Sequence, residues 1–195
     1  RFGELRGIYW RWHSALLAVY AALWFVHANF ARPPQSDFPY FPVFNAVEIG
    51  SIAVLYLLYR WLGAWLPESS LQADGRRVVA GSLPALFLLL LSGGVMRLWH
   101  IFGGVDWRLD RLLASFGVQA SLSIVWALAA IVLMVSGNRA ADRARWLVGA
   151  SIMAVVVLKL FFVELGNSGG VARIVSFIVV GVLLLLVGWF APMPP

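Results

Sequence analysis

Ionisable and amide side chains stand near one end of each apolar stretch of this sequence, so polar chemistry could occur at those ends. The seven residues we define as the candidate polar cluster are Glu48, Arg97, His100, Gln119, Lys159, Glu164 and Arg173. Its cations could hold a phosphate or a carboxylate, and Glu48 or His100 could transfer protons. The opposite halves of the same stretches contain almost no comparable groups, and this asymmetry is the strongest functional hint in the sequence.

The elements that must position these residues are transmembrane helices. Of the 195 residues, 62% are hydrophobic and 12% are charged, whereas a soluble domain is about half apolar and a quarter charged. An apolar run of about 18 residues or more can cross the hydrocarbon core of a bilayer. Six runs qualify: residues 10–30, 43–66, 78–96, 115–136, 146–165 and 172–190. We predict an all-α integral membrane protein, a single polytopic bundle of about six transmembrane helices, with a short interfacial helix within residues 101–114.

The distribution of Lys and Arg around these runs predicts an orientation. One set of ends contains Arg1, Arg6, Arg11, Arg60, Arg76, Arg77, Arg139, Arg143 and Arg145, and the other contains Arg32, Arg97, Arg108, Arg111 and Arg173. Because the more basic ends remain in the cytoplasm, both termini are expected there and the candidate polar cluster faces outward. The arginines stand singly or in short groups between apolar runs, so no nucleic-acid partner is expected.

Lys159 is the only lysine, and it lies about five residues inside the end of its run, roughly 8–10 Å deep at about 1.5 Å per residue. Two interpretations are open for it. Its long stem could lift the ammonium to the interface, or it could be a buried cation that pairs with Glu48 or Glu164 or awaits an anionic substrate. For Glu48 we favour a pairing with Lys159 or Arg173, which could simply hold helices together.

Arg97 and His100 are three residues apart, so they project from neighbouring positions of one helix. Together they could bind an anion next to a titratable imidazole; separately, each could be an interfacial anchor. The sequence has no Cys, no phosphate-binding glycine loop, no nucleophile-elbow motif and no metal-ligand spacing. We therefore predict no metal and no cofactor. The pairs Gly93-Gly94 and Gly149-Ala150 indicate close helix contacts.

The second half of the chain resembles the C-terminal portion of DUF2339, a family of large bacterial predicted membrane proteins. The residues that carry the resemblance are RLWH at 97–100, SFGVQASLSIVWALAAIVLMVSG at 115–137, RARWLVGASIMAVVVLKLFFVEL at 143–165 and ARIVSFIVVGVLLLLVGWFAPMPP at 172–195. The stretch FPYFPVFNAVEIG at 38–50 is a weaker match. The resemblance implies a longer parent protein with more helices in the bacterial inner membrane, and it implies no activity.

Three functions are compatible with these residues. The cluster could line a cavity that transports or flips a polar or lipid-linked cell-envelope component. It could instead belong to an integral membrane enzyme that modifies an envelope glycan or lipid. Finally, the bundle could be a scaffold or assembly subunit that packs against other helices. The expected partners are the lipid bilayer, further transmembrane helices of the same parent protein and, for the first two functions, an envelope lipid or glycan.

Overall fold

The structure is a computed structural model, and it describes residues 2–33, 40–68 and 73–160 together with positions 178, 181, 182, 185 and 188. These residues form helices and no strand. The helices are α1 (Phe2–Phe30), α2 (Ala46–Glu68), α3 (Ala73–Ile101), α4 (Leu109–Ala114), α5 (Phe116–Arg139) and α6 (Arg143–Lys159). The chain divides into two compact units, Arg1–Leu112 and Leu113–Pro195, which are described separately.

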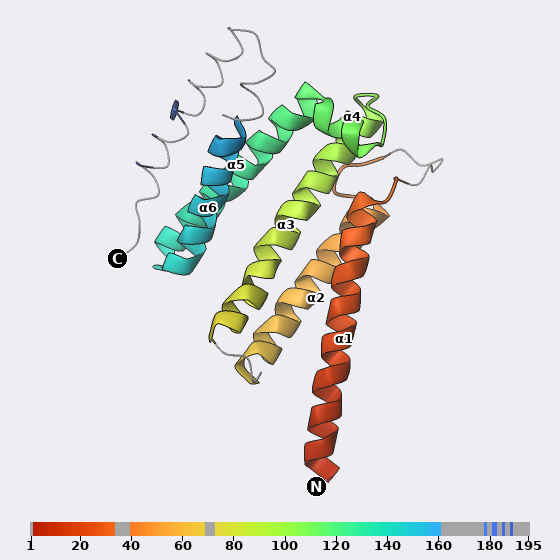
Figure 1. Ribbon diagram of the computed structural model, residues 1–195, viewed down its shortest axis with the longest axis vertical. Helices are drawn as coiled ribbons and strands as arrows, with labels where there is room; N and C mark the ends of the chain where they lie inside the picture. Colours follow the sequence, from red (N-terminus) through yellow and green to blue (C-terminus); the bar gives the residue numbers. More distant parts are fainter. Residues whose placement is uncertain are drawn as a thin grey trace. The chain divides into compact units, whose positions relative to one another are not determined.

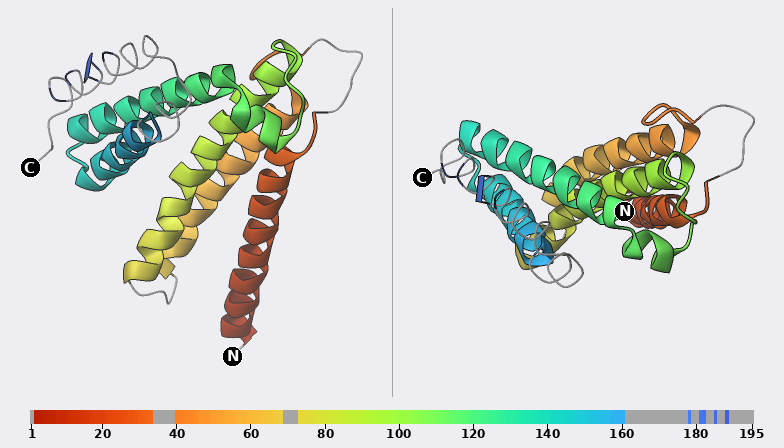
Figure 2. Two further views of the ribbon diagram at one scale, coloured as in Figure 1. Left: turned by 45° about the horizontal axis from the view of Figure 1, so that its top comes forward. Right: turned by 90° about the horizontal axis from the view of Figure 1, so that it is seen from above.

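The first unit contains α1, α2 and α3, which alternate in direction (Figure 1). The end of α1, the start of α2 and the end of α3 therefore meet at one end of the unit. Toward its N-terminus α1 diverges from the other two helices (Figure 2), and Trp10 and Trp12 on that part are 77% and 70% exposed. Helix α1 is thus held against α2 and α3 mainly at the end where the polar residues lie.

The described part of the chain confirms the helical class and leaves the full number of spans as a prediction. Three helices are long and apolar enough to cross a membrane, and these segments are Ala46–Leu66, Gly81–Ile101 and Phe116–Arg139. The expected helix at 172–190 is described only at the five isolated positions given above, which are helical, and the end of the expected helix at 146–165 lies outside the described residues.

The observed helix boundaries differ from the predicted ones where polar residues continue a helix beyond its apolar run. The prediction of 78–96 for the third segment is too short, since α3 runs from Ala73 to Ile101 and includes Pro84 in its interior. Hydropathy marks only the part of a helix that crosses hydrocarbon, and proline is tolerated in such helices. The expected short helix within 101–114 is confirmed as α4.

The second unit is described mainly as an antiparallel hairpin of α5 and α6 (Figure 1). Asp142 starts α6 as its N-cap, because its side chain accepts a hydrogen bond from the backbone N–H of Arg145 at 3.0 Å. A Cβ atom at Gly149 would lie 2.8 Å from the carbonyl oxygen of Ala130, which confirms that this glycine allows close helix contact. The single six-helix bundle that we expected stays a prediction.

Candidate functional site

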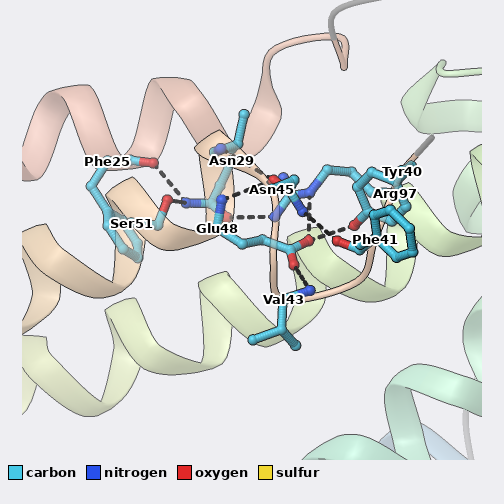
Figure 3. Close-up of polar contacts among 10 residues, drawn as sticks. Phe25, Asn29, Tyr40, Phe41, Val43, Asn45, Glu48, Ser51 and Arg97 are labelled. Carbon is cyan, nitrogen blue, oxygen red and sulfur yellow. Dashed lines mark hydrogen bonds and ion pairs between the residues drawn. The ribbon is translucent and has the colours of Figure 1, made fainter. Parts of the chain in front are cut away.

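A buried ion pair joins α2 to α3 in the first unit. The Nε atom of Arg97 donates to Oε1 of Glu48 at 3.1 Å. Both side chains are almost fully buried, with 1% of Arg97 and 5% of Glu48 exposed. Such a pair is costly to remove from water, so further hydrogen bonds must satisfy the remaining donors and acceptors. Figure 3 shows these bonds around the two residues.

The segment before α2 covers the carboxylate of Glu48. The hydroxyl of Tyr40 donates to Oε1 at 2.5 Å, and the backbone N–H of Val43 donates to Oε2 (Figure 3). Burial and the hydrogen bond to Glu48 raise the pKa of Tyr40 to about 12, so its hydroxyl stays protonated and continues to donate. Val43 has a φ of +70°, which is strained for a β-branched residue. We call residues 40–45 the strap.

Local sequence places Glu48 within reach of the strap. Asn45 is the N-cap of α2, and its Oδ1 atom accepts hydrogen bonds from the backbone N–H groups of Val47 at 3.1 Å and Glu48 at 3.0 Å. Glu48 is therefore the third residue of the helix, where a capping-box glutamate reaches back toward the preceding backbone. Here it reaches the N–H group of Val43, two residues before the cap.

Asn29 connects α1 to the same group of residues. Its Nδ2 atom donates to the carbonyl oxygen of Phe25 at 2.9 Å and to Oγ of Ser51 at 3.3 Å. Its Oδ1 atom accepts from Nη2 of Arg97 at 3.4 Å. Ser51 is 0% exposed and Asn29 2%. The Glu48–Arg97 network, by which we mean Asn29, Tyr40, Val43, Glu48, Ser51 and Arg97, thus links all three long helices of the unit.

The network contains one buried nitrogen atom that differs from the others in its hydrogen bonding. Nη1 of Arg97 is buried and has no hydrogen-bond partner among the described residues. It lies over Gly93, one turn earlier in α3, where an added Cβ atom would be 3.2 Å from Nη1 and 2.7 Å from Oδ1 of Asn29. The glycine therefore makes the room in which the guanidinium and the amide meet.

Replacing Gly93 with alanine is expected to lower the free energy of unfolding of the first unit by about 1–2 kcal/mol, because the methyl group displaces Asn29 or Arg97. Gly81→Ala in the same helix is the matched control, since its added Cβ would meet nothing within 4 Å. Denaturant titration of both variants in micelles measures the difference. Equal effects would show that Gly93 has no special packing role.

His100 does not join this network. Its Nδ1 atom lies 2.7 Å from the carbonyl oxygen of Val105, and its ring meets the edge of Trp107 at 5.6 Å between ring centres. The Trp107 indole donates in turn to the carbonyl oxygen of Phe30 at 3.2 Å. The predicted pair of Arg97 and His100 is therefore separated: one residue points into the helix bundle, and the other holds the loop after α3.

Lys159 bridges α6 to α5 in the second unit. Its Nζ atom donates to the carbonyl oxygen of Gln119 at 2.9 Å and to Oγ of Ser123 at 2.7 Å. Gln119 in turn donates from Nε2 to the carbonyl oxygen of Leu113 at 2.9 Å. Lys159 of α6 is thus brought together with Gln119 and Ser123, which both lie on α5. Lys159 is half-buried, and its ammonium group is hydrogen-bonded to the neighbouring helix.

Within the first unit Glu48 pairs with Arg97, a partner that the sequence did not suggest for it. The favoured pairings of Glu48 with Lys159 or Arg173 stay predictions, because Lys159 belongs to the second unit. Arg97 lies near the end of α3, which runs antiparallel to α2, so it reaches the start of α2 within one unit. Glu164 and Arg173 lie outside the described residues.

The candidate polar cluster lacks several members of the network. It does not include Tyr40, Val43 or Ser51, because hydroxyl groups and a backbone N–H group carry no charge that would mark them in the sequence. The sequence did contain a signal for the contact between Glu48 and the segment before α2. This signal is the Asn-x-x-Glu spacing of Asn45 and Glu48, which marks a helix start.

Comparison with known families agrees with this architecture. The sequence profile of one family, described as predicted membrane protein (DUF2339), matches residues 3–194. The chain belongs to DUF2339. The match covers nearly the whole chain, including the first half, where the resemblance was weaker. No curated protein and no solved structure matches the sequence. Membership confirms a membrane protein and assigns no activity.

The network limits the chemistry open to this DUF2339 chain. Both oxygens of Glu48 accept hydrogen bonds from within the unit, so the carboxylate is neither free nor exposed. No group of three or more His, Cys, Asp or Glu side chains that could hold a metal occurs among the described residues. In this arrangement the Glu48–Arg97 network acts as a connection between helices.

Proposed function

We propose that this DUF2339 chain is a structural membrane module, in which buried polar contacts fix the helices and apolar surfaces pack against lipid or further helices. The observation that carries the proposal is the closed Glu48–Arg97 network, which ties α1, α2 and α3 together. A charged pair inside a bilayer is a functional candidate by default. Here its hydrogen bonds are directed at the protein itself, which supports a structural role.

The exposed surface of the long helices supports the same proposal. Large apolar side chains on them point outward, among them Leu16 at 67%, Leu23 at 64%, Leu57 at 63% and Leu128 at 57% exposed. Such a surface suits lipid tails or neighbouring transmembrane helices. We place the module in the bacterial inner membrane with both termini in the cytoplasm, beside further helices of a longer parent protein. The Glu48–Arg97 network then lies toward the external side.

Transport or flipping of a polar or lipid-linked envelope component is the second candidate. One observation favours it: Nη1 of Arg97 lacks a partner among the described residues and could meet an anionic group if the strap opened. An enzyme acting on an envelope glycan or lipid is less well supported, because its acid–base candidates Glu48 and His100 are both bound within the unit.

Cysteine accessibility distinguishes the two candidates, and the sequence is suited to it because it has no native Cys. Ser51→Cys places a thiol in the network, at a position that is 0% exposed. Phe44→Cys, in the strap and 79% exposed, is the positive control. Intact cells or sealed vesicles are treated with a membrane-impermeant thiosulfonate.

For a structural module, we expect the thiol at position 51 to react at least about 100-fold more slowly than the thiol at position 44. The reagent can enter only when the network opens, and this opening costs about 3 kcal/mol or more of free energy. Comparable rates at the two positions would show an aqueous path to the network. That result would overturn the structural proposal in favour of transport.

A further inference from the structure

We propose that a groove beside Arg60, between α2 and α3, is a binding site for an anionic phospholipid, with the lipid phosphate on Arg60 and an acyl chain along the groove. The groove has a volume of about 570 Å³. Its lining residues are Tyr59, Arg60, Leu62, Gly63, Ala64, Leu66 and Leu83. It is independent of the Glu48–Arg97 network and of the proposed structural role.

The charge of Arg60 needs a partner that the described part of the chain does not provide. Arg60 lies six residues before Leu66, the end of the membrane-spanning segment, so it is about 9 Å inside that end. Its side chain is exposed, and no described residue makes a hydrogen bond or an ion pair with it. An arginine at this depth requires a counter-charge or water, and the anionic headgroup of a phospholipid can supply the counter-charge.

The walls of the groove suit a hydrocarbon chain. Leu62 lines the groove and is buried, and Leu66 and Leu83 contribute apolar surface from the two helices. At Gly63 an added Cβ would meet no atom within 4 Å, so the missing side chain widens the groove. The volume lies within the range of small-ligand sites, and the mostly apolar lining with a single cation matches the chemistry of a lipid.

The aromatic residues around the groove indicate that it lies near the membrane–water interface. Trp61 and Trp65 stack on each other in the same helix, with ring centres 5.1 Å apart. Tryptophan side chains prefer the membrane–water interface, where the phosphate groups lie. The predicted orientation puts this end in the cytoplasmic leaflet, where anionic lipids attract basic side chains. Arg60 and the groove therefore offer both the charge and the apolar surface that a phospholipid requires.

The test is native mass spectrometry of the full chain in micelles titrated with phosphatidylglycerol or phosphatidylcholine. We expect the wild type to prefer phosphatidylglycerol and Arg60→Gln to weaken its binding about fivefold, the effect of about 1 kcal/mol per basic residue near a membrane surface. Gly63→Leu, which fills the groove and keeps the charge, is expected to reduce binding as well. Arg139→Gln, an exposed arginine at the end of α5, is the charge-matched control and should bind as the wild type does.

Three results would overturn the proposal. Equal losses in Arg60→Gln and Arg139→Gln would mean that Arg60 only reaches the interface and attracts lipid without a specific site. Unchanged binding in Gly63→Leu would mean that no acyl chain occupies the groove. Displacement of the lipid by millimolar inorganic phosphate would assign the site to a free anion instead. Circular dichroism of each variant confirms that the helices are intact.

Discussion

Replacing Arg97 with alanine is expected to destabilise the first unit by about 3–5 kcal/mol, which is the usual cost of leaving one member of a buried ion pair without its partner. The loss has a specific cause. Glu48 would keep its hydrogen bonds from Tyr40 and Val43 and lose its only described cation, while remaining 5% exposed. The free energy of unfolding, measured by titrating micelles with dodecyl sulfate, gives the effect.

Two comparisons make this result specific. Arg108→Ala removes an exposed arginine, with 69% of its side chain accessible, that pairs with Asp110, and it should leave stability unchanged. The double variant Glu48→Gln/Arg97→Met removes both charges and keeps a long apolar side chain, so it should recover most of the stability lost in Arg97→Ala. A loss below about 1 kcal/mol in Arg97→Ala would contradict the closed network, because water would then have to reach Glu48.

For Glu48 and Arg97, the sequence predicted that the two residues lie at the same end of their helices, and it did not predict that they pair. Charged and amide groups at alternate helix ends must share one face of the membrane in any antiparallel bundle, so the meeting of Glu48 with Arg97 near the ends of α2 and α3 follows from topology. Which cation pairs with which carboxylate depends on the rotation of each helix about its axis. That rotation is set by packing details, such as the space over Gly93, that hydropathy does not reveal.

The strap was beyond sequence reasoning for a related reason. Residues 40–45 include Pro42 and precede a helix, so a loop was predictable. Its function as a cover depends on a positive φ at Val43, and sequence alone does not predict that conformation for a β-branched residue. The sequence gives more information about the partners of Lys159. Gln119 and Ser123 are four residues apart, so their positions share a helix face.

The close approach of α5 and α6 in the second unit depends on a glycine. Gly149 faces the backbone of α5: an added Cβ would lie 2.8 Å from the carbonyl oxygen of Ala130 and 2.9 Å from the backbone N of Met134. Backbone atoms cannot turn aside as a side-chain end can, so the helices themselves would have to separate. Separation would also weaken the packing of Ile152 and Val156, which are buried in the same helix.

Gly149→Ala is therefore expected to lower the stability of the α5–α6 hairpin by about 1–3 kcal/mol, even though alanine favours a helix over glycine by about 1 kcal/mol. Gly181→Ala is the matched control, because its added Cβ would meet nothing within 4 Å and only the gain in helix propensity should appear. Dodecyl sulfate titration of the two variants should give effects of opposite sign. If both variants were stabilised, α5 and α6 would not be in close contact at Gly149, and Lys159 would lose the packed surface that holds it against Gln119 and Ser123.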